Sequence, residues 1–309
     1  MHIHLHLKKK HQKTAAFVGI ASIVIIFISI LIIHFPTPQK KITLIALGDI
    51  MLGRHVAELM DQGVDPFQYI RFDNGHFPKQ ISTTSDFVMA NLEGPITTAD
   101  LCQDKAYSFK FAPSTATLLK NRGITAVSDA NNHSQDCYIK GFRDTQNYLQ
   151  KAGVIHFGGF VLKDMATETV INGVHIALVG LDMTLSPPPS NDVYTLIKTL
   201  KTRNTYVIVN IHWGNEYSPT ANAQQIMVAH RLIDNGVDVV VGGHPHVVEP
   251  IEIYKGKTIF YSLGNFIFDQ TDPDAKVGIL VSVTLSPDGT QTYKTYPYHI
   301  NHSQPKLDK

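Results

Sequence analysis

The 309-residue sequence has almost no net charge and only two cysteines. Its 27 Lys and Arg residues nearly balance its 26 Asp and Glu residues, which gives a formal net charge of +1. Nucleic-acid-binding proteins usually carry a basic face, so this balance argues against nucleic acid as a partner. The sequence also lacks internal repeats, long linkers and low-complexity segments outside its basic N-terminal tail. We therefore expect one large domain after the first forty or so residues.

The two cysteines are Cys102 and Cys137. Neither belongs to a Cys-x-x-Cys pattern, which disfavours a cysteine-based metal site. A disulfide between them is expected in an oxidising compartment, and two buried free thiols are the alternative. No cysteine follows the apolar N-terminal segment, so a lipoprotein anchor is not indicated.

The N-terminal region contains a long apolar run at 15–33, nineteen residues without a charge. At about 1.5 Å per residue, this run is just long enough to cross a hydrocarbon core of roughly 30 Å. A cleaved secretory signal is the alternative, but its apolar region would be shorter. The sequence HFPTPQKK that follows also has no small-x-small cleavage site. We expect an uncleaved transmembrane helix over residues 15–34.

Lysines on both sides of this run bear on its orientation. Four of them precede it, at positions 8, 9, 10 and 13, and positive charge stays on the cytoplasmic side of a membrane. Lys40 and Lys41 follow the run and weaken this bias. We expect a single-pass cell-membrane protein with a cytoplasmic tail over 1–14 and an extracellular domain over 35–300. A flexible C-terminal tail is expected over 301–309.

Apolar runs alternate with amphipathic segments along the rest of the chain. Buried strands are expected in seven runs, at 42–47, 87–92, 124–130, 174–182, 205–212, 237–243 and 257–263. Helices are expected in three amphipathic stretches that end in glycine, at 113–123, 138–153 and 222–236. The turn signal SPDG at 286–289 predicts a hairpin near the C-terminus. Such alternation is typical of an α/β layered fold.

Polar residues that can bind metal follow five of the expected strands. They are Asp49; Asn91 and Glu93; Asn132 and His133; His212; and His244 and His246. Because open α/β sheets place their sites at the carboxyl ends of strands, we expect these side chains to converge. Taken singly, Asp49 could cap a helix, NLEG could form a turn, and His212 could be a buried structural histidine. Their joint occurrence favours a metal site.

The order of these motifs carries a resemblance. GDIMLGR, NLEGPIT, SDANNHSQD, IHWGNEY, GGHPHV and YSLGNFIFD resemble the CapA-type branch of the calcineurin-like metallophosphoesterase superfamily, bacterial capsule synthesis proteins associated with poly-γ-glutamate. The likeness covers roughly residues 42 to 270. It implies a calcineurin-like metallophosphoesterase layered fold, with central β-sheets flanked by helices, after the N-terminal transmembrane helix. It also implies a role in the synthesis, transport or attachment of an extracellular anionic polymer.

The resemblance further implies two divalent metal ions bridged by Glu93. The implied ligands are Asp49 and His246 on one ion, and Asn132, His212 and His244 on the other. His133 is then the acid that protonates a leaving group. Carboxylate, amide and imidazole ligands suit Mn²⁺, Zn²⁺ or Fe, and such a pair activates water for hydrolysis of a phosphoester, ester or amide.

Two positions depart from the superfamily pattern. Met51 stands where a histidine ligand is usual, and Ser134 stands where an aspartate usually follows the catalytic histidine. The missing ligand could be replaced by His55 or by water, or the site could hold a single metal. Asp129 or Asp136 could orient His133 instead. These departures weaken the case for ordinary phosphatase activity.

Three residues near the motifs are candidates for substrate contact: Asn91, Arg54 and Trp213. Solvated surface charge is the alternative for Arg54, and a cover over the site is the alternative for Trp213. The expected partners are the membrane, other subunits of a membrane polymer-synthesis complex, and an anionic polymer or small-molecule substrate. Two other functions stay open, a non-catalytic metal-binding subunit of such a complex and a secreted metallophosphoesterase.

Overall fold

The structure, a computed structural model, describes residues 40–72, 81, 85–184 and 186–308. The predicted cytoplasmic tail and transmembrane helix lie outside these residues. Within the described ranges, no helix has the length and hydropathy needed to cross a membrane. The chain divides into two units, Met1–Gln39 and Lys40–Lys309, and the fold below is that of the second.

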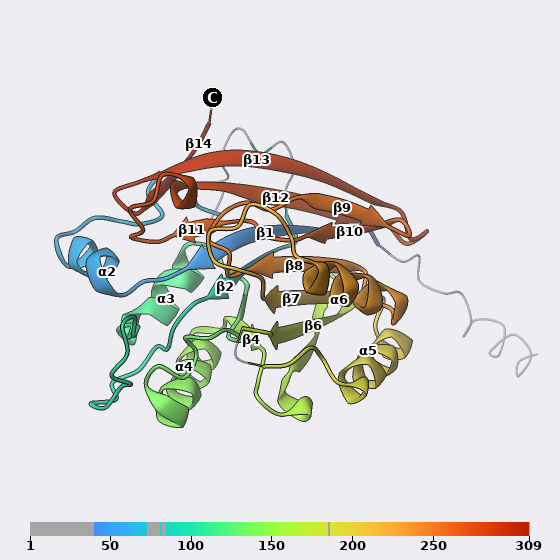
Figure 1. Ribbon diagram of the computed structural model, residues 1–309, viewed down its shortest axis with the longest axis horizontal. Coiled ribbons are helices and arrows are strands. Elements are labelled where there is room, and N and C mark those ends of the chain that lie inside the picture. Colours follow the sequence, from blue (N-terminus) through green and yellow to red (C-terminus); the bar gives the residue numbers. More distant parts are fainter. Residues whose placement is uncertain (1–39, 73–80, 82–84, 185, 309) are drawn as a thin grey trace, which may run out of the picture. The chain divides into compact units, whose positions relative to one another are not determined.

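Two β-sheets pack face to face between layers of helices (Figure 1). The eight-stranded sheet has the order β14-β13-β12-β1-β2-β3-β4, with β11 also paired to β1, and the six-stranded sheet has the order β5-β6-β7-β8-β10-β9. The first sheet contains β1 (Ile42–Ile50), β2 (Phe87–Leu92), β3 (Ala126–Ser128), β4 (Ile155–Phe157), β11 (Asn265–Ile267), β12 (Val277–Leu285), β13 (Gln291–Asn301) and β14 (Gln304–Leu307). The second contains β5 (Ala166–Ile171), β6 (Val174–Asp182), β7 (Tyr206–His212), β8 (Val239–Gly243), β9 (Ile251–Tyr254) and β10 (Lys257–Phe260).

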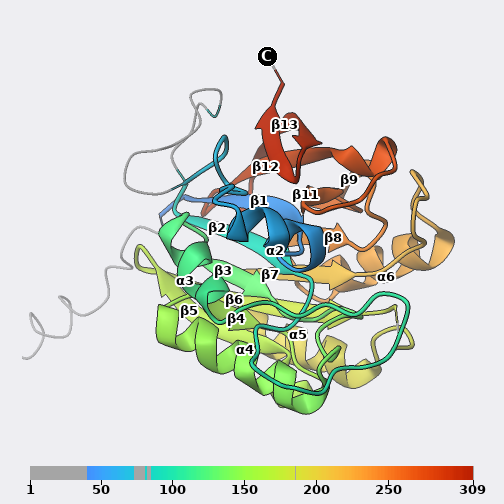
Figure 2. The same ribbon diagram turned by 90° about the vertical axis from the view of Figure 1, so that its left-hand side faces the viewer.

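Helices cover the outer face of each sheet. Those on the first sheet are α2 (Arg54–Asp61), α3 (Ser114–Asn121) and α4 (Tyr138–Ala152), and those on the second are α5 (Asn191–Arg203) and α6 (Ala223–Asp234). Two short 3₁₀ helices, η1 (Leu162–Asp164) and η2 (Asp274–Lys276), complete the elements of the described chain. The helices α3 and α4 lie side by side against the first sheet (Figure 2).

The central strands are apolar on both faces because both faces are buried. In β1, Ile42 and Leu44 face the second sheet, whereas Ile45 and Leu47 face the helices. The same alternation in β6 sends Ile176 and Leu178 between the sheets, and Ala177 and Val179 toward the helices on the outer face. Continuous apolar runs therefore mark strands buried on two sides, which confirms the predicted α/β layered fold.

The C-terminal region differs from the prediction in one respect. The expected hairpin is present, because β12 and β13 pair antiparallel around the turn at 286–289. The predicted flexible tail over 301–309 is wrong for Gln304–Leu307, which forms β14 and pairs with β13. The Gln304 side chain donates to the backbone oxygen of Asp65 at 2.7 Å. The polar composition of this segment suits an edge strand with one face buried and one exposed.

Candidate metal centre

The predicted metal-binding residues converge where strands of both sheets end. Asp49 lies near the end of β1, and Glu93 and Asn132 follow β2 and β3, which are parallel neighbours in the first sheet. From the second sheet, His212 ends β7, and His244 and His246 follow β8. Atoms of Asp49, Glu93 and His212 that can bind metal all lie within 4.8 Å of one another. The convergence expected from the strand ends is confirmed for these three residues.

Asp49 is fully buried and held by hydrogen bonds to each oxygen. Its Oδ1 accepts from Asn91 Nδ2 at 2.8 Å, and its Oδ2 accepts from the backbone N–H of His244 at 3.0 Å. Burial raises the pKa of Asp49 to about 6. The last residue of β8 must be small, because a Cβ on Gly243 would lie 2.5 Å from Asp49 Oδ1. The glycine before His244 is thus required by the close packing of the two sheets.

Glu93 is a fully buried acid in this cluster. Both of its carboxylate oxygens lack a hydrogen bond to any described residue. Desolvation, followed by repulsion from Asp49, raises the pKa of Glu93 well above 4.5. Its Oε1 lies 3.9 Å from Nε2 of His133 and 3.9 Å from Nε2 of His246. A buried carboxylate of this kind needs a compensating positive charge, and His246, whose pKa burial lowers to about 3, supplies none.

The remaining predicted ligands also present unused atoms. Each of three such ligands has one buried atom without a hydrogen-bond partner in the described part of the chain: Asn132 Oδ1, His212 Nε2 and His244 Nδ1. Burial lowers the pKa of His212 well below 6.5, that of His244 to about 4 and that of His246 to about 3. Neutral imidazole is the form that binds metal. The oxygen and nitrogen donors therefore fit divalent cations.

The backbone of the loop after β8 is strained at the two histidines. His244 has φ of 94° and His246 has φ of 60°, and non-glycine residues rarely adopt such positive values. The His246 ring is fixed by Nδ1, which lies 2.9 Å from Asn265 Oδ1. Such strain persists where the surrounding structure enforces it, and here both imidazoles are directed to the same site.

His133 is oriented by one of the two predicted acids. Its Nδ1 lies 2.7 Å from Asp136 Oδ2, and its Nε2 faces Glu93. The Phe109 ring stacks on the imidazole with a centroid distance of 4.0 Å. The other predicted acid, Asp129, instead lies 3.8 Å from His156 Nδ1. Of the two acids, Asp136 is therefore the one that orients His133.

Asn91 is buried next to Asp49 and does not line either of the two cavities described below. Besides donating to Asp49, it accepts a hydrogen bond from Asn131 Nδ2 at 3.0 Å through its own Oδ1. Asn131 also bonds the carbonyl of Leu92 and accepts from the backbone N–H of His133. The predicted substrate contact of Asn91 is replaced by a role in holding Asp49, and Asn131 is a site residue that the sequence did not predict.

Three other residues lie away from the cluster. Met51 is fully buried, and its sulfur accepts from the Gly53 N–H at 3.1 Å, so the usual ligand position is part of the apolar core. His55 has a side chain that is 57% exposed and lies 3.0 Å from Glu58, so it does not replace the missing ligand here. The prediction that Trp213 stacks on a substrate is wrong, because the indole is fully buried and donates to Tyr261 O at 2.9 Å.

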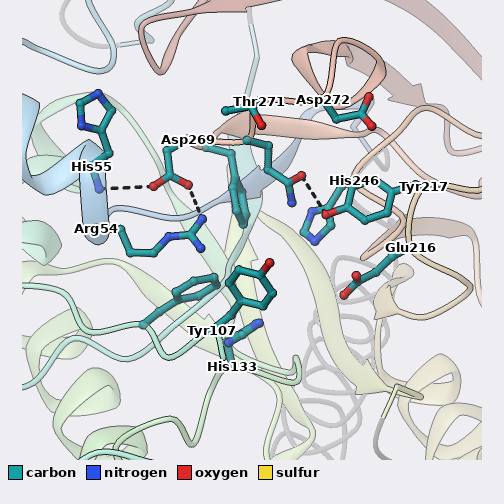
Figure 3. Close-up of a pocket in the computed structure, with 13 residues that line it drawn as sticks. Arg54, His55, Tyr107, His133, Glu216, Tyr217, His246, Asp269, Thr271 and Asp272 are labelled. Atoms are coloured by element: carbon teal, nitrogen blue, oxygen red, sulfur yellow. Dashed lines mark hydrogen bonds and ion pairs between the residues drawn. The ribbon is translucent and has the colours of Figure 1, made fainter. Parts of the chain in front are cut away.

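A cavity of about 540 Å³ adjoins the cluster and is lined by His133 and His246 (Figure 3). Arg54 also lines it and is ion-paired with Asp269. Its guanidinium lies 4.8 Å from the Phe109 ring centroid, so it is held in place and is not a freely solvated charge. Arg54 thus lines the cavity beside the cluster, and its contact with a substrate stays a prediction. A second cavity, of about 670 Å³, is lined by Asn132 and other residues.

The two cysteines form a disulfide. Cys102 lies in the loop between β2 and α3, and Cys137 directly precedes α4, 35 residues later in the sequence. This bond ties the loop to the segment that carries Asn132 and His133.

Comparisons with known proteins agree with this geometry. A family model described as bacterial capsule synthesis protein PGA_cap matches residues 43–270. The PGA biosynthesis protein CapA of Bacillus subtilis is 33% identical over 280 residues, covering 84% of this chain and 72% of that protein. The capsule biosynthesis protein CapA of Bacillus anthracis is 31% identical over 295 residues, covering 87% of this chain and 70% of that protein.

Solved structures show a similar fold at low sequence identity. A novel phosphatase from Mycoplasma pneumoniae has a TM-score of 0.53 at 13% identity, covering 84% of this chain and 93% of that one. A hypothetical protein from Thermus thermophilus has a TM-score of 0.52 at 15% identity, covering 84% of this chain and 99% of that one. On the family match and on the two CapA relatives, the chain belongs to the PGA_cap family of bacterial capsule synthesis proteins, the CapA-type branch of the calcineurin-like metallophosphoesterase fold.

Proposed function

We propose that this protein is a membrane-anchored, metal-dependent hydrolase that acts in the synthesis, transport or attachment of an extracellular anionic polymer, poly-γ-glutamate. The observation that carries the hydrolase proposal is the cluster of buried donor atoms without partners, above all both oxygens of Glu93. The names of the two CapA relatives support the polymer. The apolar run at 15–33 supports the anchor.

The cluster would hold divalent cations through six residues: Asp49, Glu93, Asn132, His212, His244 and His246. Cations bound there would supply Lewis-acid polarisation of the scissile bond and a lowered pKa for water. Glu93 is central to the set, because it can offer one oxygen to each of two cations. Burial keeps the three histidines neutral and ready to bind.

His133 would act on the leaving group. The Nδ1–H donates to Asp136, which fixes the ring and leaves Nε2 free to hold a proton at the edge of the cavity. The stacked Phe109 ring limits rotation of the imidazole. A general acid held in this way donates its proton as the bond to the leaving group breaks. Arg54, fixed by Asp269, would contact an anionic group of the substrate.

The test compares metal content and turnover in the detergent-solubilised full-length chain. We expect bound Mn, Zn or Fe in the wild type and its loss in the Glu93→Ala, His244→Ala double variant. With a phosphodiester or γ-glutamyl amide reporter, His133→Ala should keep the metal and lose turnover by about 10²–10⁴-fold, the usual contribution of a general acid. A folded wild type without metal would exclude the mechanism.

A second function is favoured by Met51, which leaves the site one ligand short of the usual pattern. The protein would then be a non-catalytic, metal-binding subunit of a polymer-synthesis complex. Metal that is retained in the wild type, with no turnover of any reporter and no effect of His133→Ala, would favour this function over hydrolysis.

A further inference from the structure

The loop between β2 and α3 is fastened to the segment that carries His133. Residues 98–110 of this loop form neither helix nor strand. Its residue Cys102 is bonded to Cys137, and the next residue, Gln103, makes two further contacts. The Gln103 N–H donates to Asp136 O at 2.6 Å, and its side-chain Nε2 donates to Gln135 O at 2.9 Å. Three successive residues of the His133 segment are therefore held at one end of the loop.

Lys105 forms an ion pair with the buried Asp136. Its Nζ lies 2.6 Å from Asp136 Oδ1, and Asp136 is fully buried. The same ammonium donates to the carbonyl of Asn132 at 3.4 Å. The other oxygen of Asp136 faces His133, so Lys105 and His133 lie on opposite oxygens of one carboxylate. An ion pair with a buried partner is costly to break, because the remaining charge is left unpaired.

Phe109 closes the other end of the loop. Its backbone N–H donates to Asp136 Oδ2 at 2.6 Å, and its ring stacks on His133. Between these two fastened ends the loop is open to solvent, and Tyr107 is 64% exposed. Leu101, the residue before Cys102, is 71% exposed. A segment with so little buried surface has little tendency to stay in place without specific ties. The disulfide is its covalent tie.

We propose that residues 102–109 form a clasp that positions His133. In this clasp Lys105 neutralises and holds Asp136, the disulfide keeps the loop against the His133 segment, and Phe109 fixes the imidazole plane. Lys105, Cys102 and Cys137 are positioning residues, because they act through Asp136 and do not reach the reacting atoms. The catalytic consequence rests on the proposed hydrolase function, whereas the mechanical coupling does not.

The experiment uses the full-length chain and two independent ways of opening the clasp. One is Lys105→Met, with Lys105→Arg as the conservative variant and Lys255→Met as a matched control that breaks an exposed ion pair with Asp234. The other is removal of the disulfide, by the Cys102→Ser, Cys137→Ser double variant and, separately, by treating the wild type with dithiothreitol. Dithiothreitol supplies the two electrons and two protons that convert the disulfide to thiols.

Two measurements separate the clasp from the proposed function. Amide hydrogen exchange should be faster at Gln103 and Phe109 in the serine variant and in the reduced wild type, and it should stay unchanged elsewhere. On a reporter, Lys105→Met should lower kcat by about 10–100-fold, the usual cost of removing an outer-shell partner, with KM and metal content kept. Lys105→Arg should restore most of the rate, and Lys255→Met should match the wild type.

The outcomes are distinct. Unchanged exchange at residues 102–109 after loss of the disulfide would overturn the clasp, and so would equal kcat in Lys105→Met and Lys255→Met. The wild type could turn over no reporter while amide exchange rises in both the serine variant and the reduced wild type. In that case the clasp stands, and hydrolysis is the proposal that fails.

Discussion

Glu249 is a buried carboxyl group outside the metal centre. Its Oε2 accepts from Gln225 Nε2 at 2.8 Å, and its Oε1 has no hydrogen-bond partner among the described residues. Burial raises the pKa of Glu249 from 4.5 to about 7. The folded state therefore keeps a proton that the unfolded chain loses, so this residue favours folding most below about pH 4.5. The contribution falls as the pH rises toward 7 and is constant above it.

Glu249→Gln removes this pH dependence. We expect the variant to unfold at a temperature about 2–4 °C higher than the wild type at about pH 8, and with little gain at about pH 5. Thermal unfolding followed by circular dichroism at both pH values is the measurement. Glu58→Gln, on the exposed face of α2, is the control and should follow the wild type. An equal gain at the two pH values would contradict the titration of Glu249.

Most residues of the candidate metal centre could be predicted from the sequence, and the residues that support them could not. Asp49 and His212 are identifiable because a polar residue at the end of an apolar run stands out. Asn131 and Lys105 lie in loops without periodicity, and the sequence gives no sign that the first bonds Asn91 or that the second faces Asp136. Stacking of Trp213 on a substrate could not be judged from its adjacency to His212, because consecutive side chains at a strand end point in opposite directions.

The strand β14 protects the edge of β13. It pairs along β13 through four residues, and Leu307 is buried against the first sheet. Without β14, the unpaired N–H and C=O groups of β13 would be exposed to other chains.

Truncation after Asn301 should therefore lower stability and promote association. Loss of the buried Leu307 alone should cost about 2–5 kcal/mol, as for other buried leucines that are removed. Scanning calorimetry measures the first effect and sedimentation velocity the second. Deletion of Lys309 alone is the control. A truncated protein that stays monomeric with unchanged thermal stability would show that residues 302–309 contribute nothing to the fold.

At the level of elements, burial on two faces decided what the sequence could predict. The strands at 87–92 and 174–182 have the predicted bounds, and nearly all of their residues are buried. Short or half-exposed strands such as β5 and β9 show no comparable run. The helix α5 was not predicted, since its C-cap is Asn204 and it lacks the terminal glycine used to find the others.

For the molecule as a whole, bound metal would join the two sheets at one edge. The ligands from β1, β2 and β3 belong to one sheet and those from β7 and β8 to the other. A cation that binds only the folded arrangement stabilises it by mass action.

Chelator-stripped protein should therefore gain stability as Mn²⁺ or Zn²⁺ is added. At about a hundred times Kd the gain is about 2.7 kcal/mol, readable as a rise in Tm. Glu93→Gln should have a higher Tm than the wild type without metal, because it removes an unpaired buried carboxylate, and should respond less to added metal. A wild-type Tm that is insensitive to metal would exclude a cation between the sheets.

The hydrogen bond from His244 to Asp49 joins residues 195 positions apart in the chain. During synthesis the first half of the ligand set emerges long before the second, and no short piece of the chain contains the complete set. The site is therefore assembled only when both sheets have formed, so that binding of a cation there would report completed folding. Such a cation would then come from the compartment in which the last strands fold, not from the one in which the first ligands were made.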